Sequence, residues 1–198
     1  MNTPTADPLR YAGFWPRLGA LLMDCLILLP LIALEIWAGR RYRLFDLYQL
    51  VPNVLVGLFY SVYLVRRYGG SPGKLIVGVR IRKVSGEPVG YREAFLRYLP
   101  DCVLGLLSSI AMIIAVFHMS DAEYHALASH ERFKRMLELV PFWYKPTHIL
   151  SYVWIWGELI VLLTNRKRRA LHDFIAGTVV VHASPDKTLQ ATAVAPVS

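Results

Sequence analysis

Residues 11–37 read YAGFWPRLGALLMDCLILLPLIALEIW. The apolar run that follows Arg17 contains charged side chains only at Asp24 and Glu35. About 20 mostly apolar residues are enough to cross a bilayer as an α-helix, because each residue advances the helix by about 1.5 Å. The stretch therefore predicts a transmembrane helix over residues 18–38.

Three further apolar stretches have the character of membrane spans, over residues 48–65, 99–119 and 148–164. Trp and Tyr lie at the ends of the apolar runs, as is typical of membrane interfaces. The first stretch is too long for the core of a cleaved signal peptide, and it contains Asp24. The predicted fold class is an all-α polytopic membrane protein with four transmembrane helices.

The net charge of +8 is better explained by topology than by nucleic-acid binding. Lys and Arg are concentrated before the first predicted crossing, between the second and third, and after the fourth, which places 15 of the 22 on one side. Because cytoplasmic segments carry an excess of Lys and Arg, we expect both termini in the cytoplasm. No nucleic-acid motif accompanies the charge, so no nucleic-acid partner is expected.

Segments between the crossings carry patterns of their own. Alternating apolar and basic residues over 77–84 predict a cytoplasmic strand, and residues 91–98 predict an interfacial helix that leads into the third crossing. Residues 120–140 predict one extracytoplasmic amphipathic helix, because Ser120 and Glu123 have the spacing of a capping box and apolar residues follow on one stripe.

The membrane domain is expected to span residues 11–183. Residues 1–10 contain two prolines and small polar residues, and residues 184–198 are mostly small residues without a core-forming pattern. We predict both to be disordered. Cys25 and Cys102 both fall inside predicted crossings, which indicates buried thiols rather than a disulfide framework.

The two halves of the chain resemble each other. The first and third crossings each carry an Arg followed by an adjacent Asp and Cys, and the segments that follow the second and fourth crossings read KLIVGVRI (74–81) and DFIAGTVV (173–180). Parallel repeats about an axis along the membrane normal are one way to build transporters. We hypothesise a pseudo-twofold bundle in which residues 79–82 and 178–181 pair as strands beneath the membrane. The alternative is chance similarity between short, biased segments.

Two acids are the main candidates for function. Asp24 and Glu158 each lie about seven residues from the inner end of their predicted helices, which places both carboxyls about 10 Å deep. With Arg17 or Arg97 below them, they could bind a cation or share a proton; alternatively, they form hydrogen bonds that only stabilise helix packing. The candidate transport or charge network consists of Arg17, Asp24, Arg97, Asp101 and Glu158.

Other chemistry has weaker support in the sequence. His118, Asp121, His125 and His130 are candidate metal ligands, but no third well-placed ligand joins the pair Asp121 and His125, so we expect no metal. His172 is more simply an interfacial polar residue than a proton relay. No nucleophilic triad, Walker loop or GxGxxG motif is present, so we expect neither an enzyme nor a cofactor.

Four motifs, taken together and in order, resemble the signatures of the RDD family of bacterial integral membrane proteins. They are AGFWPRLGALLMD (12–24), SPGKLIVGVRI (71–81), REAFLRYL (92–99) and RRALHDFIAGTVVV (168–181). The resemblance implies that Arg17, Asp24 and Asp173 are the arginine and the two aspartates that name the family. Lys74 and Gly177 occupy its PGK and AGT positions.

The resemblance also implies a bacterial inner-membrane location, and transport is proposed for some family members. The predicted helix over residues 120–140 is not part of the common pattern. Our leading hypothesis is transport of a cation or small solute at the buried acids. The alternative is a non-catalytic accessory or scaffold subunit. Four short helices leave little room for alternating access, so besides the lipid bilayer we expect a second copy or another membrane protein as partner.

Overall fold

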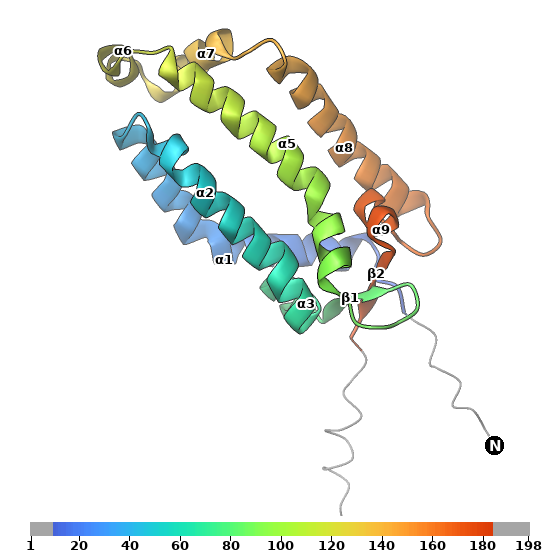
Figure 1. Cartoon of the computed structure of the whole chain (residues 1–198). Helices are drawn as coiled ribbons and strands as arrows, with labels where there is room; N and C mark the ends of the chain where they lie inside the picture. Colours follow the sequence, from blue (N-terminus) through green and yellow to red (C-terminus); the bar gives the residue numbers. More distant parts are fainter. Residues whose placement is uncertain (1–9, 184–198) are drawn as a thin grey trace, which may run out of the picture.

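The computed structural model describes residues 10–183, and this part of the chain is mostly helical (Figure 1). Within it, four helical segments are long and apolar enough to cross a membrane, as predicted. They are α1 (Phe14–Arg41), the helical run Phe45–Ile76, α5 (Tyr91–Phe117) and α8 (Tyr144–Thr164). All four begin earlier than predicted, because the aromatic and polar residues before each apolar run are already helical. The predicted leader over residues 1–10 and the tail over 184–198 fall outside the described residues, apart from Arg10.

The second crossing is built from three consecutive pieces: α2 (Phe45–Leu58), the π-helical turn η1 (Phe59–Tyr63) and α3 (Leu64–Tyr68). It ends at Gly69, whose φ of +83° is a left-handed conformation that glycine adopts readily. π-Helical turns inside α-helices are frequent at functional sites. Here the turn carries Tyr60, whose hydroxyl reaches α1.

The third crossing continues from the predicted helix over residues 91–98. This segment was expected to lead into the crossing, and α5 is one continuous helix over both. Pro100 lies inside it and has no N–H to donate to the preceding turn, which bends a helix without ending it when neighbours support the freed carbonyl. Figure 1 shows the axis of α5 changing direction near its first turns.

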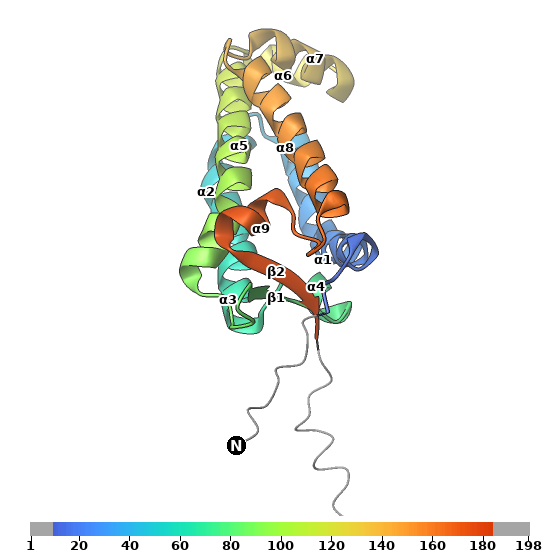
Figure 2. The ribbon, with the colours of Figure 1, turned by 90° about the vertical axis from the view of Figure 1, so that its right-hand side faces the viewer.

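The segment 120–140 also differs from its prediction, because it forms two helices, α6 (Asp121–Ala126) and α7 (Ser129–Leu139). The Ser120 hydroxyl accepts a hydrogen bond from the backbone N–H of Glu123, but the Glu123 carboxylate pairs with Arg135 at 2.9 Å and does not complete a capping box. The chain is extended at Leu127, and α6 and α7 lie across the end of the bundle (Figure 2). Tyr124 and Met136 are buried there against the end of α5.

A two-stranded sheet closes the opposite end. Strand β1 (Val79–Lys83) pairs antiparallel with β2 (Thr178–His182), with Val79 opposite His182 and Lys83 opposite Thr178. The predicted pairing of residues 79–82 with 178–181 is thereby confirmed.

Each strand is preceded by a short helix that we did not predict, α4 (Pro72–Ile76) before β1 and α9 (Leu171–Ala176) before β2. The positive-φ residues Gly78 and Gly177 connect these helices to their strands. The halves therefore repeat the order of long helix, short helix and strand.

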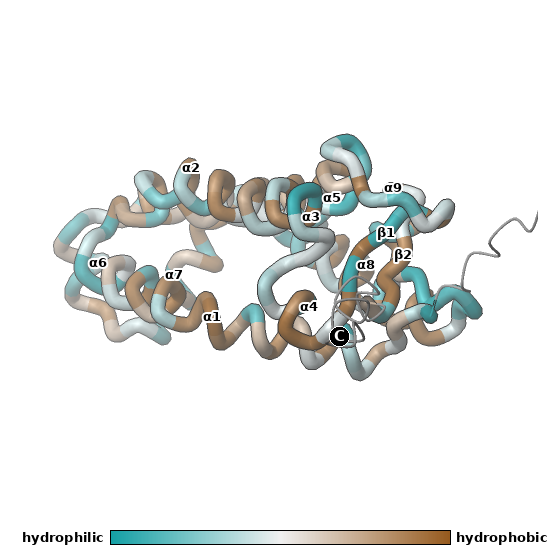
Figure 3. Tube along the Cα trace, turned by 90° about the horizontal axis from the view of Figure 1, so that it is seen from below, coloured by the Kyte–Doolittle hydropathy of each residue, from teal (hydrophilic) through white to brown (hydrophobic). Residues whose placement is uncertain are grey.

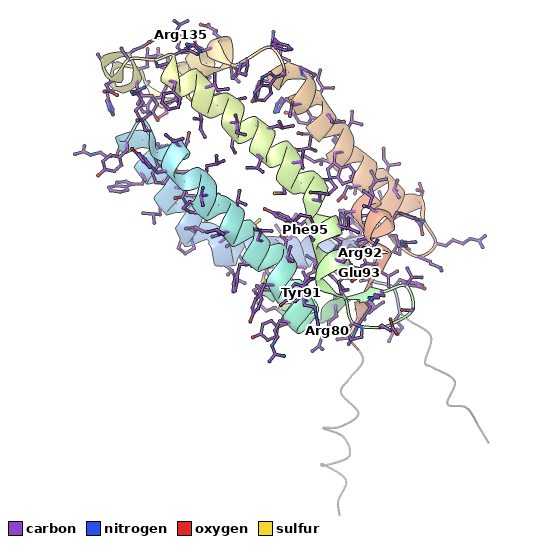
Figure 4. The ribbon with its side chains drawn as sticks, in the orientation of Figure 1. Arg80, Tyr91, Arg92, Glu93, Phe95 and Arg135 are labelled. Carbon is purple, nitrogen blue, oxygen red and sulfur yellow. The ribbon has the colours of Figure 1, made fainter. Side chains whose placement is uncertain are left out.

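The packing follows the same repeat. Helix α1 packs chiefly against α4, and α5 packs against α9, α2 and α8. Figure 3 shows the bundle from the sheet end, where α1 and α4 lie on one side and α2 and α5 on the other. The described ends of the chain also meet the sheet, since His182 N donates to Arg10 O at 2.9 Å. Figure 4 places Arg80 and Glu93 at this end and Arg135 at the far end.

The helix surfaces explain what surrounds the protein. On α1, Leu22, Leu26 and Leu29 are each more than half exposed, and so are Ile149 and Ile155 on α8. Continuous apolar surface of this extent is avoided in water but matches the hydrocarbon of a bilayer. The chain is therefore a multi-pass membrane protein.

Candidate functional site

Asp173 is the centre of the charge network at the sheet end of the helices, between the bundle and the sheet. It lies in the first turn of α9 and is fully buried, and its Oδ2 accepts a hydrogen bond from the N–H of Ala170 at 3.1 Å. Arg17 donates to Oδ2 at 2.8 Å, while Arg97 and the Thr178 hydroxyl donate to Oδ1. One carboxylate thus joins α1, α5, α9 and β2.

The two arginines are held by further acceptors. Arg17 donates from Nη2 to the carbonyl of Arg168 at 2.6 Å, and Arg97 donates from Nη1 to the Thr178 hydroxyl at 2.8 Å. A guanidinium has a planar set of donors, so several fixed acceptors define its orientation. Both side chains are therefore oriented by the short helix and strand that follow the fourth crossing.

His172 connects Arg97 to Glu158. Because Arg97 can only donate, its 2.8 Å contact with Nε2 makes that nitrogen the acceptor, and the proton of the neutral ring is assigned to Nδ1, which donates to Glu158 Oε1. Burial, and then the charge of Arg97, lowers the pKa of His172 to about 4, although Glu158 opposes this shift. The ring is thus neutral at pH 7.

Asp24 has a separate set of donors. The Tyr60 hydroxyl donates to Oδ1 at 2.8 Å, the Ser71 hydroxyl to Oδ2 at 2.6 Å, and the backbone N–H of Gly73 to Oδ1 at 2.6 Å. A side chain on Gly73 would overlap the Ala20 carbonyl and lie 2.6 Å from Asp24 Oδ1, so glycine is required where α4 meets α1. The SPG sequence before Lys74 is therefore explained by the need to surround this acid.

A cavity of about 280 Å³ lies between these clusters. Its ionisable lining comes from α1, α4, α5, α8 and α9: Arg17, Asp24, Lys74, Arg97, Glu158 and His172. Its apolar walls are Phe14, Leu18, Leu21, Leu159 and Leu162, with Ala170 beside them.

Two groups at this cavity lack full partners. Lys74 Nζ donates to the Ser71 hydroxyl at 3.3 Å and forms no ion pair with any carboxylate of residues 10–183. Glu158 accepts both of its hydrogen bonds at Oε1, and no donor among the described residues reaches Oε2. The cavity therefore offers an ammonium group and a carboxylate oxygen to a ligand.

The structure brings most of the candidate network together. Arg17, Asp24, Arg97 and Glu158 line one cavity. Each acid has its own donors, however, so a proton shared directly between Asp24 and Glu158 is not seen in residues 10–183. Asp101 lies elsewhere: it accepts from Trp154 Nε1 at 2.9 Å and lines a smaller cavity of about 150 Å³.

The family positions have distinct places. Lys74 lines the cavity. Asp173 pairs with Arg17 and Arg97, the two arginines that line the cavity, and Gly177 follows α9 with a φ of +65°. Asp173 forms ion pairs and caps the first turn of α9, whereas Lys74 forms no ion pair or helix cap within residues 10–183. Tyr60 and Thr178 were missed, because an isolated hydroxyl residue carries no signal of its partner.

A second polar cavity of about 320 Å³, near the α6 and α7 end, was also missed. Asp46, Gln49 and Asn53 follow one another at helical spacing on α2, and Gln49 Nε2 donates to Glu35 Oε1 at 3.2 Å. This polar stripe within an apolar helix was a usable sequence signal. Nearby, Asp121 pairs with Arg43, and no group of three or more His, Cys, Asp or Glu in residues 10–183 is arranged to hold a metal.

Comparison with known proteins assigns the chain to a family. The model of the RDD family matches residues 11–177, a range that holds Arg17, Asp24 and Asp173. The chain is also similar to the "Uncharacterized protein YckC" of Bacillus subtilis (strain 168), with 27% identity over 179 residues that cover 88% of this chain and 86% of that protein. The family match spans most of the membrane domain and includes the buried arginine and both aspartates, and the chain therefore belongs to the RDD family.

Proposed function

We propose that this protein transports a small charged solute and that the cavity lined by Lys74 and Glu158 is its binding site. The observation that carries the proposal is the incomplete pairing of these two groups inside a membrane bundle. Charged groups at membrane depth are costly, and those that persist without full partners commonly mark solute or ion pathways. The solute supplies the missing partners.

The neighbouring charges support the site without being its ligands. Asp173 fixes Arg17 and Arg97, and Arg97 in turn orients His172, which donates to Glu158. Asp24 holds α4, the helix that carries Lys74. A preorganised frame of this kind allows one carboxylate oxygen and one ammonium to stay available.

The orientation of the site follows from the charge distribution. Basic residues 66–97 and 166–169 gather at the sheet end, where the positive-inside rule places the cytoplasm of a bacterial inner membrane. The cavity then lies toward the cytoplasmic leaflet, and the cavity beside α2 lies toward the outside. Two polar cavities at opposite ends suit alternating access, which a second copy of the chain would help to support.

The test is solute flux in proteoliposomes that contain the purified full chain. We expect uptake of Na⁺, K⁺ or a small zwitterion to exceed the uptake by protein-free vesicles. Glu158→Gln and Lys74→Met should each reduce uptake to the level of protein-free vesicles. Asp121→Asn, at an exposed ion pair, is the matched control and should retain the uptake. If none of these solutes moves faster than in protein-free vesicles, the transport proposal fails.

A second function is favoured by the uncovered surfaces of α1 and α8, which are far less buried than α5. Such faces suit an accessory subunit that packs against another membrane protein. Purification of the full chain from its native membrane in a mild detergent tests this alternative. A stoichiometric second membrane protein that is lost when Leu22 and Leu26 are changed to Ala would support it, and a homogeneous single species would oppose it.

A further inference from the structure

We infer that the cavity binds the zwitterionic ammonium-phosphate group of an amphiphile, the group that phosphatidylethanolamine carries. This inference rests on the proposed function, because it names the ligand class of the same site. Three features of the cavity lead to it: its charge balance, its two unsatisfied groups and the composition of its mouth.

The charge balance favours a ligand without net charge. The cavity lining contains three cations, Arg17, Lys74 and Arg97, and two acids, Asp24 and Glu158, and a third acid, Asp173, pairs with both arginines. His172 is neutral, since Nε2 accepts from Arg97. A simple cation or anion would leave one uncompensated charge in a region of low dielectric constant, which is unfavourable. A zwitterion leaves none.

The unsatisfied groups define the two ends of the ligand. The Lys74 ammonium has three donors and uses one on the Ser71 hydroxyl, so it can donate to a phosphate oxygen. Glu158 Oε2 accepts nothing from the described residues, so it can accept from a primary ammonium. A quaternary ammonium, which has no N–H, cannot make that second contact.

The mouth of the cavity favours a ligand with an apolar part. Leu21 lines the cavity and is 58% exposed on the lipid-facing surface, so the cavity reaches that surface beside α1. Leu159 and Leu162 of α8 form another wall. Helix α1 packs chiefly on α4, and α8 packs on α5 and α9. An amphiphile can therefore enter sideways, with its chains along these leucines.

The same group can come from two sources, a phospholipid or free glycerophosphoethanolamine, whose phosphate is also a diester. Native mass spectrometry of the detergent-purified full chain distinguishes them with dioctanoyl-phosphatidylethanolamine, its phosphatidylcholine and phosphatidylglycerol counterparts, and free glycerophosphoethanolamine as competitor. We expect the ethanolamine lipid to bind at least about tenfold more tightly than the other two, since only it completes both charge-assisted contacts. Displacement by equimolar glycerophosphoethanolamine would indicate a soluble ligand, and failure to displace would indicate the lipid.

Variants test the two contacts separately. Glu158→Gln and Lys74→Met should each weaken binding of the ethanolamine lipid about tenfold, whereas the exposed matched controls Glu87→Gln and Lys167→Met should bind as the wild type does. If either site variant does not fold, the ranking of the three lipids on the wild-type chain still decides the matter.

Equal binding of the three lipids, or unchanged binding by both site variants, would overturn the inference. Flux is measured independently in proteoliposomes, so cation uptake without lipid preference would leave the transport proposal standing. Lipid preference without any flux would instead leave the ligand assigned and transport rejected.

Discussion

Asp173 and Glu158 lie on either side of His172, and their surroundings differ. Asp173 is completely buried, and both of its oxygens receive donors from Arg17, Arg97, Ala170 and Thr178. Glu158 is 21% exposed, and within residues 10–183 it receives hydrogen bonds at one oxygen only, both from His172. The difference separates an acid that stabilises the fold from one that is available to a ligand.

The largest effect is expected when Asp173 is changed to Asn, because two buried guanidinium groups then lose their shared carboxylate. Removing one partner from a buried ion pair typically costs about 3–5 kcal/mol. Thermal unfolding in detergent, followed by circular dichroism, measures the loss. Asp121→Asn removes an acid from an exposed pair with Arg43 and should cost less than about 1 kcal/mol. Equal losses in the two variants would contradict the assigned role of Asp173.

The next effect is a dependence of stability on pH. The pKa of His172 is about 4 when folded and 6.5 when unfolded, so between these values the unfolded chain binds the additional proton. The contribution of His172 to the free energy of unfolding is therefore complete above pH 6.5 and is lost as the pH falls toward 4. This loss is at most roughly 3 kcal/mol. Unfolding of the wild type and of His172→Asn should be compared from pH 7.5 to 4.5. If both curves have the same slope over this window, the ring is not held neutral.

A smaller effect is expected at the junction of α1 and α4. Gly73→Ala places a methyl group against the Ala20 carbonyl and Asp24, which forces the helices apart at a cost of about 1–3 kcal/mol. Gly105→Ala is the matched control, because nothing lies within 4 Å of its added methyl group, and it should be neutral or slightly stabilising in a helix. Denaturation of both variants with SDS gives the comparison.

The smallest effect on stability is expected for Glu158→Gln. The amide oxygen can still accept from His172, and the amide nitrogen that replaces Oε2 requires no partner for folding. The free energy of unfolding should therefore fall by about 1 kcal/mol or less. Size-exclusion profiles and unfolding midpoints should match those of the wild type while solute flux is lost. A loss of stability as large as that of Asp173→Asn would show that both acids stabilise the fold.

The two halves of the chain use the same elements with reversed chemistry. In the first half, the acid is Asp24 on the long helix, and the short helix α4 supplies the N–H of Gly73. In the second half, the acid is Asp173 on the short helix α9, and the long helix supplies Arg97. Arg17 crosses from the first half to the second through its pair with Asp173. The sequence repeat predicted the shared frame, and this exchange of roles was not visible in it.

The membrane spans and the family motifs were determined by the sequence alone, because a run of apolar residues long enough to cross a bilayer is a local property. The strand pairing could also be predicted, since the repeat placed residues 79–82 and 178–181 in equivalent positions. The continuous path of α5 through Pro100 and the break at Leu127 were decided by packing at the two ends of the bundle.

Only the tertiary structure decided the roles of the charged residues. Arg17 and Asp173 are 156 residues apart, and their pairing depends on how α9 is placed against α1 and α5. The proton position of His172 depends on Arg97 and Glu158 together. The physical reason is that the cost of a buried charge is fixed by residue type, which the sequence shows, whereas its compensation depends on neighbours that only the folded chain assembles.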